Sequence, residues 1–152
     1  MVSVTPVAFP PLHRIRAAIF DLDGTLLDTE TESTHAINLA LACHGVAITP
    51  DIKRAIIGMR SGEWSSYVIK VLNLEGKMDS LDLVRQWEQN LSARLPGVAV
   101  MPGVIEAIDF FKSNGIPMAI ATSSSPASVA VKRAAHPEVR PLHISAPPRI
   151  VP

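Results

Sequence analysis

The stretch that decides the fold is Ala17-Ala18-Ile19-Phe20-Asp21-Leu22-Asp23-Gly24-Thr25, in which an apolar run leads directly into two carboxylates. A short apolar run closed by turn residues predicts a buried strand, here over residues 17–20. Two carboxylates this close repel each other, so the pair needs a divalent cation or a proton on one member. Gly24 lets the chain turn away in a conformation that a side chain disfavours. This strand end is a candidate site, and a turn with solvated acids is the alternative.

A second apolar run, Met118-Ala119-Ile120-Ala121, leads into Thr122-Ser123-Ser124-Ser125 and the helix-opening Pro126. Hydroxyls and free backbone N–H groups at a helix start favour an anion, although a serine that only caps the helix is the alternative. Two strands that each end in a polar loop indicate a parallel α/β core with its chemistry at the carboxyl ends of the strands. We therefore expect the acids and the hydroxyls at the same edge of one sheet.

Helical patterns fill the chain between the first strand and Pro96. Helices are predicted over 29–44, over 50–58, from Ser61 and from Ser80, because apolar residues recur there at helical spacing or a cap opens the segment. Prolines crowd both ends of the chain and block regular hydrogen bonding there. We predict an irregular N-terminal segment (1–13), a core (14–28 and 98–136), an inserted helical cap (29–97) and a Pro-rich irregular tail (137–152).

Composition restricts the partners. The chain has 152 residues, of which 47% are apolar, so full disorder is excluded. Fourteen basic and fourteen acidic side chains cancel, so no overall field favours nucleic acid or an acidic membrane surface. No apolar run approaches the roughly 20 residues of a membrane span. Cys43 is the single cysteine and cannot form an internal disulfide, so a reducing cytoplasm is the expected location.

The first motif, Ala18 to Glu30, resembles that of the haloacid dehalogenase-like (HAD) phosphohydrolases, and Ile120-Ala121-Thr122-Ser123-Ser124 resembles their second motif. The stretch from Met101 to Ser124 is similar to the pseudouridine-5'-phosphatase and sugar-phosphate phosphatase branch. This resemblance implies an α/β HAD-like Rossmannoid parallel core with an inserted all-helical cap. It also implies a phosphatase that acts on small phosphorylated sugars or nucleosides.

The resemblance further implies roles for the two acids. Asp21 would be the nucleophile that forms an aspartyl-phosphate. Asp23 would protonate the leaving alcohol and then deprotonate the hydrolytic water. Mg²⁺ would be held by Asp21 and by the backbone carbonyl of Asp23. This division is chemically reasonable, because a metal keeps one carboxylate ionised while the other holds a proton.

Substrate contacts are implied at five further positions. Gly24 belongs to the first motif, while the Thr122 hydroxyl, the Ser123 N–H and Ser124 would bind phosphoryl oxygens. Arg60, in Gly58-Met59-Arg60, matches a cap loop that reaches the substrate in relatives. A solvated loop arginine is the alternative for Arg60.

The family's third and fourth motifs are missing. The segment 123–152 holds one acidic residue, Glu138, and one lysine, Lys132, which we expect to be a solvated helix residue. Loss of a preorganised charge from a catalytic site commonly costs about 10²- to 10³-fold in rate, so we expect a truncated HAD core with little or no turnover. A two-stranded sheet would also leave an unpaired edge open to self-association. A phosphosugar mutase and a non-catalytic fragment that binds a partner are the alternatives.

Overall fold

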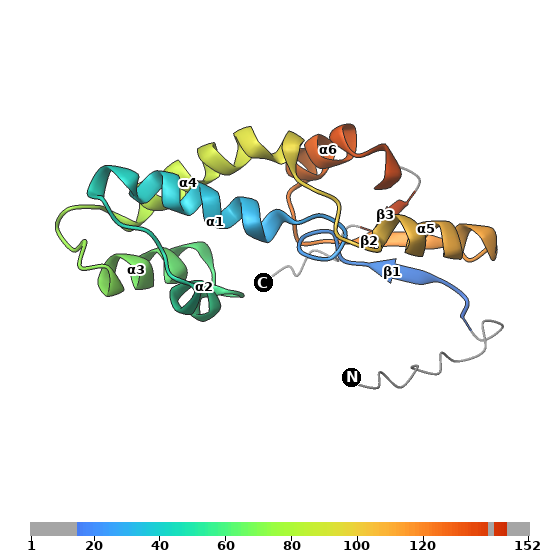
Figure 1. The fold of residues 1–152 in the computed structure, drawn as a ribbon, viewed down its shortest axis with the longest axis horizontal. Helices are drawn as coiled ribbons and strands as arrows, with labels where there is room; N and C mark the ends of the chain where they lie inside the picture. The colour runs from blue at the N-terminus through green and yellow to red at the C-terminus, as the bar shows by residue number, and fades with distance from the viewer. Residues whose placement is uncertain (1–14, 140–141, 146–152) are drawn as a thin grey trace, which may run out of the picture.

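The computed structural model describes residues 15–139 and 142–145. The predicted irregular segment 1–13 and the end of the tail, 146–152, lie outside these residues. Figure 1 shows two parts side by side along the long axis: helices α1 to α4 form the cap, and the sheet with helices α5 and α6 forms the core. None of the helices in the described part of the chain is long and apolar enough to cross a membrane.

The core is built on a parallel sheet, as the sequence predicts. Strands β1 (Ala18–Phe20), β2 (Met118–Ala121) and β3 (His143–Ser145) lie in the order β1-β2-β3. The register pairs Phe20 with Ile120, and Ile120 with Ile144 on the other side. Ile120, on the middle strand of the described sheet, is fully buried. The carboxyl ends of β1 and β2 therefore meet at one edge, and their loops leave the sheet next to each other.

The prediction of an irregular tail and a two-stranded sheet is wrong for the described part of the tail. Residues 137–139 form a short 3₁₀ helix, and β3 pairs with β2. Val139 and Leu142 are almost completely buried in the core. Local signals miss this because prolines flank a strand of only three residues, which is too short for its apolar periodicity to be recognised.

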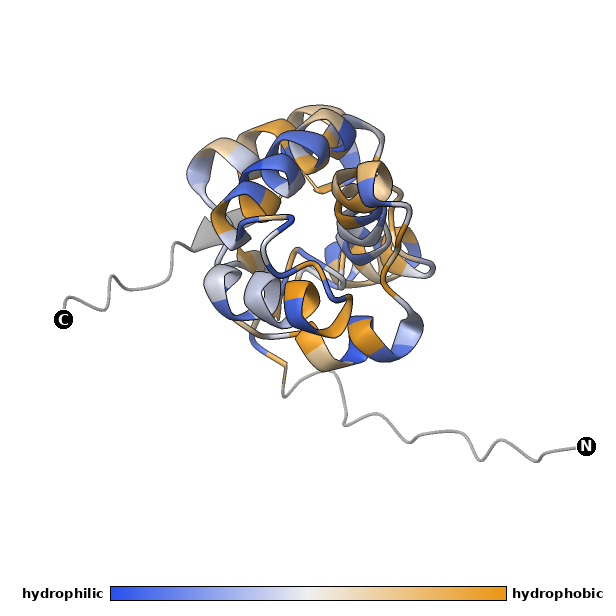
Figure 2. Ribbon diagram, turned by 90° about the vertical axis from the view of Figure 1, so that its left-hand side faces the viewer, coloured by the Kyte–Doolittle hydropathy of each residue, from blue (hydrophilic) through white to orange (hydrophobic). Residues whose placement is uncertain are grey.

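The cap contains the four predicted helices, α1 (Thr29–Leu41), α2 (Pro50–Ile56), α3 (Ser61–Val71) and α4 (Ser80–Arg94). Asp28, Thr49 and Asp79 cap the first, second and fourth by accepting a backbone N–H. The cap has its own apolar cluster, and the Trp64 and Trp87 rings meet edge to face at 5.5 Å. Figure 2, viewed from the cap end, shows hydrophobic and hydrophilic residues alternating along these helices, as amphipathic packing requires.

The chain crosses between core and cap at two adjacent places. The Asp28 N–H donates to the Ala99 carbonyl at 2.8 Å, and Leu27 forms an antiparallel bridge with Val100. Beyond this junction, α5 (Val104–Ser113) brings Phe111 against Phe20 of β1 at 5.8 Å. Helix α6 (Pro126–Ala135) follows β2. The cap is thus an insertion whose two connections are paired with each other at the end of the sheet.

Candidate active site

The loop after β1 turns tightly and sends its apolar side chains inward. The N–H groups of Leu26 and Leu27 donate to the Leu22 carbonyl at 3.1 and 3.0 Å. All three leucines are buried in the core. Gly24 adopts φ +72°, the left-handed conformation that favours glycine. This anchoring leaves the carboxylates on either side of Leu22 at the edge of the core, with Asp21 exposed and Asp23 half-buried.

Asp23 is the centre of a hydrogen-bonded cluster that joins the two predicted motifs. Ser124 Oγ donates to Asp23 Oδ2 at 2.6 Å, and Thr122 Oγ1 lies 3.5 Å from the same oxygen. Lys132 Nζ donates to Asp23 Oδ1 at 2.5 Å and to Ser124 Oγ at 2.9 Å. The structure thus brings an acid of the first motif together with two hydroxyls of the second.

Lys132 is the member of this cluster that the sequence analysis did not place in the site. The prediction of a solvated helix lysine is wrong, because Lys132 is only 3% exposed. It lies on α6 one turn beyond Val129, which is also buried and belongs to the core cluster, so both lie on the face of α6 that packs on the core. The three-residue spacing of Val129 and Lys132, which puts them on one helix face, is the signal that could have found it. A buried ammonium group needs a carboxylate partner, and Asp23 supplies it.

The surroundings of Asp23 determine its charge. Burial raises the pKa of this carboxyl, but hydrogen bonds from Lys132 and Ser124 and the charge of Lys132 outweigh burial and hold the pKa below its ordinary value. Asp23 is therefore ionised at neutral pH in the ligand-free site.

The other predicted site residues lie outside this cluster. Asp21 is exposed, and its Oδ1 accepts the Leu22 N–H at 2.8 Å. Ser123 is exposed as well and forms no side-chain hydrogen bond with the described residues. Arg60 is exposed just before α3 and does not line the central cavity defined below, although the adjacent Ser61 does. The roles predicted for these three residues stay predictions.

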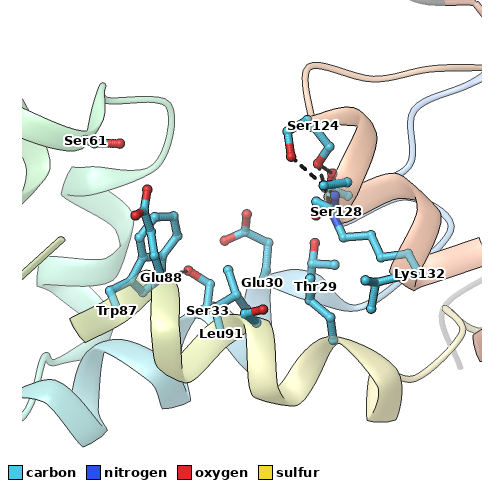
Figure 3. A pocket seen from close by; sticks show the side chains of 16 residues that line it. Thr29, Glu30, Ser33, Ser61, Trp87, Glu88, Leu91, Ser124, Ser128 and Lys132 are labelled. Carbon is cyan, nitrogen blue, oxygen red and sulfur yellow. Dashed lines mark hydrogen bonds and ion pairs between the residues drawn. The ribbon is translucent and has the colours of Figure 1, made fainter. Parts of the chain in front are cut away.

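A cavity of about 580 Å³ lies between cap and core, and residues of the Asp23 cluster form part of its wall. We call it the central cavity. Asp23, Ser124 and Lys132 line its core end, and Ser33, Trp87 and Glu88 line its cap end. Figure 3 shows the cap side chains facing the space opposite Ser124, Ser128 and Lys132. A volume of this size accommodates a small metabolite.

The donor groups suit Mg²⁺ only in part. Within the described residues there is no group of three or more His, Cys, Asp or Glu side chains that could hold a metal. Mg²⁺, however, usually binds through one or two carboxylates, with water and substrate phosphate as its other ligands. Asp21 forms no ion pair with a described residue and fits this requirement, whereas both carboxylate oxygens of Asp23 are already hydrogen-bonded.

Comparison with known proteins agrees with this architecture. The family model described as haloacid dehalogenase-like hydrolase matches residues 15–143. The chain is 28% identical to the "probable pseudouridine-5'-phosphatase" of Drosophila melanogaster, over 84% of this chain and 54% of that protein. It is 31% identical to the phosphorylated carbohydrates phosphatase of Thermotoga maritima, over 72% of this chain and 50% of that protein.

A solved structure extends the comparison to three dimensions. CbbY from Rhodobacter sphaeroides, in complex with phosphate, superimposes with a TM-score of 0.61 at 25% identity, over 91% of this chain and 66% of that chain. The chain spans about half the length of the curated relatives it matches. Since the family model covers most of this chain, the protein belongs to the haloacid dehalogenase-like hydrolase family.

Proposed function

We propose that this protein is a Mg²⁺-dependent phosphatase of small phosphorylated sugars or nucleosides that works through an aspartyl-phosphate on Asp21. The observation that carries the proposal is the cluster of Asp23, Ser124 and Lys132 at the core end of a cavity large enough for such a substrate. The similarity to phosphatases of phosphorylated carbohydrates supports the same substrate class. The cytoplasm stays the predicted location.

The phosphoryl group would bind at the core end of the central cavity. Ser124 and Lys132 line that end, and Lys132 supplies a positive charge. The hydroxyls of Ser124 and Thr122 donate to Asp23 and would have to turn to the phosphoryl group when it binds. The Ser124 N–H already donates to Thr122 Oγ1 at 3.1 Å, which fixes the loop at the start of α6. Lys132, which we expected to be solvated, would thus supply the cation at this site.

The first chemical step would be attack by Asp21. One carboxylate oxygen bonds to phosphorus while the bond between phosphorus and the alcohol oxygen breaks, and the alcohol takes a proton from Asp23. Bound Mg²⁺, held by Asp21 and the substrate phosphate, would neutralise charge on the reacting oxygens. Asp21 is exposed and forms no ion pair with a described residue, which suits this role. It does not line the central cavity itself, so the phosphoryl group would have to reach it from Asp23, two residues further along the same loop.

The second step would be hydrolysis of the aspartyl-phosphate. Asp23 accepts a proton from the attacking water, the water oxygen bonds to phosphorus, and the bond to Asp21 breaks. The Lys132 ion pair favours the ionised Asp23 that this step needs. The same ion pair opposes the protonated Asp23 that the first step needs. We therefore propose that substrate binding draws Lys132 toward the phosphate and weakens its hold on Asp23.

The experiment is a thermal melt of the chain with Mg²⁺ and beryllofluoride, which together mimic a phosphorylated aspartate. We expect the melting temperature to rise, and Asp21→Asn to abolish the rise while the ligand-free melting temperature is unchanged. Asp109→Asn, an exposed acid on α5, is the matched control and should keep the rise. A folded chain that shows no rise at millimolar ligand would contradict the proposal.

A further inference from the structure

The two ends of the central cavity differ in charge. At the core end, Lys132 is the one cation among the described lining residues, and it is paired with Asp23. At the cap end lie two carboxylates, Glu30 and Glu88. Lys53 neutralises Glu30 through an ion pair at 2.5 Å. The cap end therefore carries one uncompensated negative charge from its lining side chains, and Glu88 is its source.

Glu88 is available to a ligand. It is exposed on α4 and forms no hydrogen bond or ion pair with any described residue. Figure 3 shows its carboxylate beside Trp87 in the space that faces Ser124. An ionised carboxylate accepts hydrogen bonds and donates none, so its favourable partners are hydroxyl and N–H groups. A second phosphate or a carboxylate on the ligand would be repelled by it.

The side chains near Glu88 are positioned to contact a polar, uncharged group. The Trp87 indole N–H donates to Ser33 Oγ at 3.1 Å, which leaves the Ser33 hydroxyl proton free to donate to a ligand. The edge-to-face contact with Trp64 fixes the Trp87 ring. A rigid aromatic side chain beside a hydroxyl and a carboxylate suits a sugar, which presents both apolar C–H groups and hydroxyls.

We infer that the cap end of the central cavity selects monophosphates whose leaving group is uncharged and rich in hydroxyls, with Glu88 as the specificity-determining residue. This inference rests on the proposed function, because the phosphoryl group must occupy the core end. Glu88 would accept hydrogen bonds from the sugar hydroxyls and would repel a second anionic group. Two kinds of ligand should therefore bind more weakly: a bisphosphate, which a phosphosugar mutase must bind, and a substrate with a carboxylate next to the phosphate.

Titration calorimetry of the full chain with Mg²⁺ tests the inference. The four probes are inorganic phosphate, ribose 5-phosphate, ribose 1,5-bisphosphate and 2-phosphoglycolate. We expect ribose 5-phosphate to bind about five- to tenfold more tightly than each of the two probes with a second anionic group, because a like charge across a solvated cavity costs about 1 kcal/mol.

Two variants at residue 88 separate charge from shape. Glu88→Gln keeps the length and a hydrogen-bond acceptor, so ribose 5-phosphate should bind nearly unchanged while the bisphosphate binds about three- to fivefold more tightly. Glu88→Lys should reverse the preference. Glu75→Lys adds the same charge at an exposed loop position that does not line the central cavity. It should change the affinity for neither ribose 5-phosphate nor the bisphosphate.

Three other outcomes show whether the proposed function or the role of Glu88 is wrong. If no probe binds, both the proposed function and this inference are wrong. If all four probes bind but Glu88→Lys changes none of the affinities, the inference is wrong and the proposed function stands. If the bisphosphate binds most tightly and Arg60→Gln removes that advantage, Arg60 binds a second phosphate, and a mutase-type substrate replaces the one inferred here.

Discussion

Lys132 Nζ lies 2.5 Å from Oδ1 of Asp23, 109 residues earlier in the chain. The contact joins α6 to the loop after β1 and places the positive end of a buried lysine in the candidate active site. A buried ion pair does not by itself stabilise a fold strongly, because both ions lose their hydration. The main effect of this pair is to hold Asp23, Ser124 and the start of α6 in one arrangement.

Removing the carboxylate should destabilise the chain more than removing both charges. Asp23→Ala leaves the Lys132 ammonium buried without a partner, so we expect a loss of about 3 kcal/mol in the free energy of unfolding. The double variant Asp23→Ala with Lys132→Met takes away the stranded charge and keeps an apolar side chain of similar length. It should recover part of that loss in urea titrations. Equal stabilities for the single and double variants would show that Lys132 is not desolvated.

The Asp23 ion pair should make stability depend on pH in the acid range. Because the pKa of Asp23 is lower in the folded than in the unfolded chain, the unfolded chain binds the proton more readily. The contribution is complete above the unfolded value near 3.8 and is lost as pH falls through the folded pKa. Unfolding free energies measured from pH 5 downward should therefore decrease. Asp23→Asn should flatten this part of the curve, and Asp109→Asn should not.

Leu142, which follows the predicted core in the sequence, should be part of the hydrophobic core. Leu142 is 1% exposed and packs with Val139 and Ile120 in one cluster. Leu142→Ala should lower the free energy of unfolding by about 2–4 kcal/mol, because it removes buried methyl groups and leaves a cavity. Leu81→Ala, at a leucine that is 73% exposed, should change it by less than about 0.5 kcal/mol. Chemical denaturation of the two variants makes the comparison, and similar losses would contradict the buried position of Leu142.

Two glycines should respond in opposite directions to a methyl group. Gly24 has φ +72°, and a Cβ there would come 3.4 Å from Glu30 Cγ. Gly24→Ala should therefore destabilise the chain by about 1 kcal/mol through backbone strain. Gly62 lies in the first turn of α3 at negative φ, with nothing within 4 Å of a Cβ. Gly62→Ala should raise the melting temperature, because alanine loses less backbone entropy on folding.

The sequence by itself was sufficient for the elements that have a local signature. The second strand is observed over the predicted residues, 118–121, and the cap has its four predicted helices. The expectation that the two motif loops meet is also confirmed, since Asp23 contacts Ser124. These predictions succeed because apolar periodicity and capping residues act over a few neighbouring positions.

Tertiary structure alone decided the remaining features. Lys132 has an ordinary helical context, and only the packing of α6 on the core directs it to Asp23 instead of solvent. The strand at His143–Ser145 forms because β2 offers a free parallel edge and the core buries Val139 and Leu142. Glu88 becomes a candidate ligand contact only because α4 faces the core across the central cavity. Each of these features depends on burial or charge contributed by residues far away in the chain, and no local pattern encodes that environment.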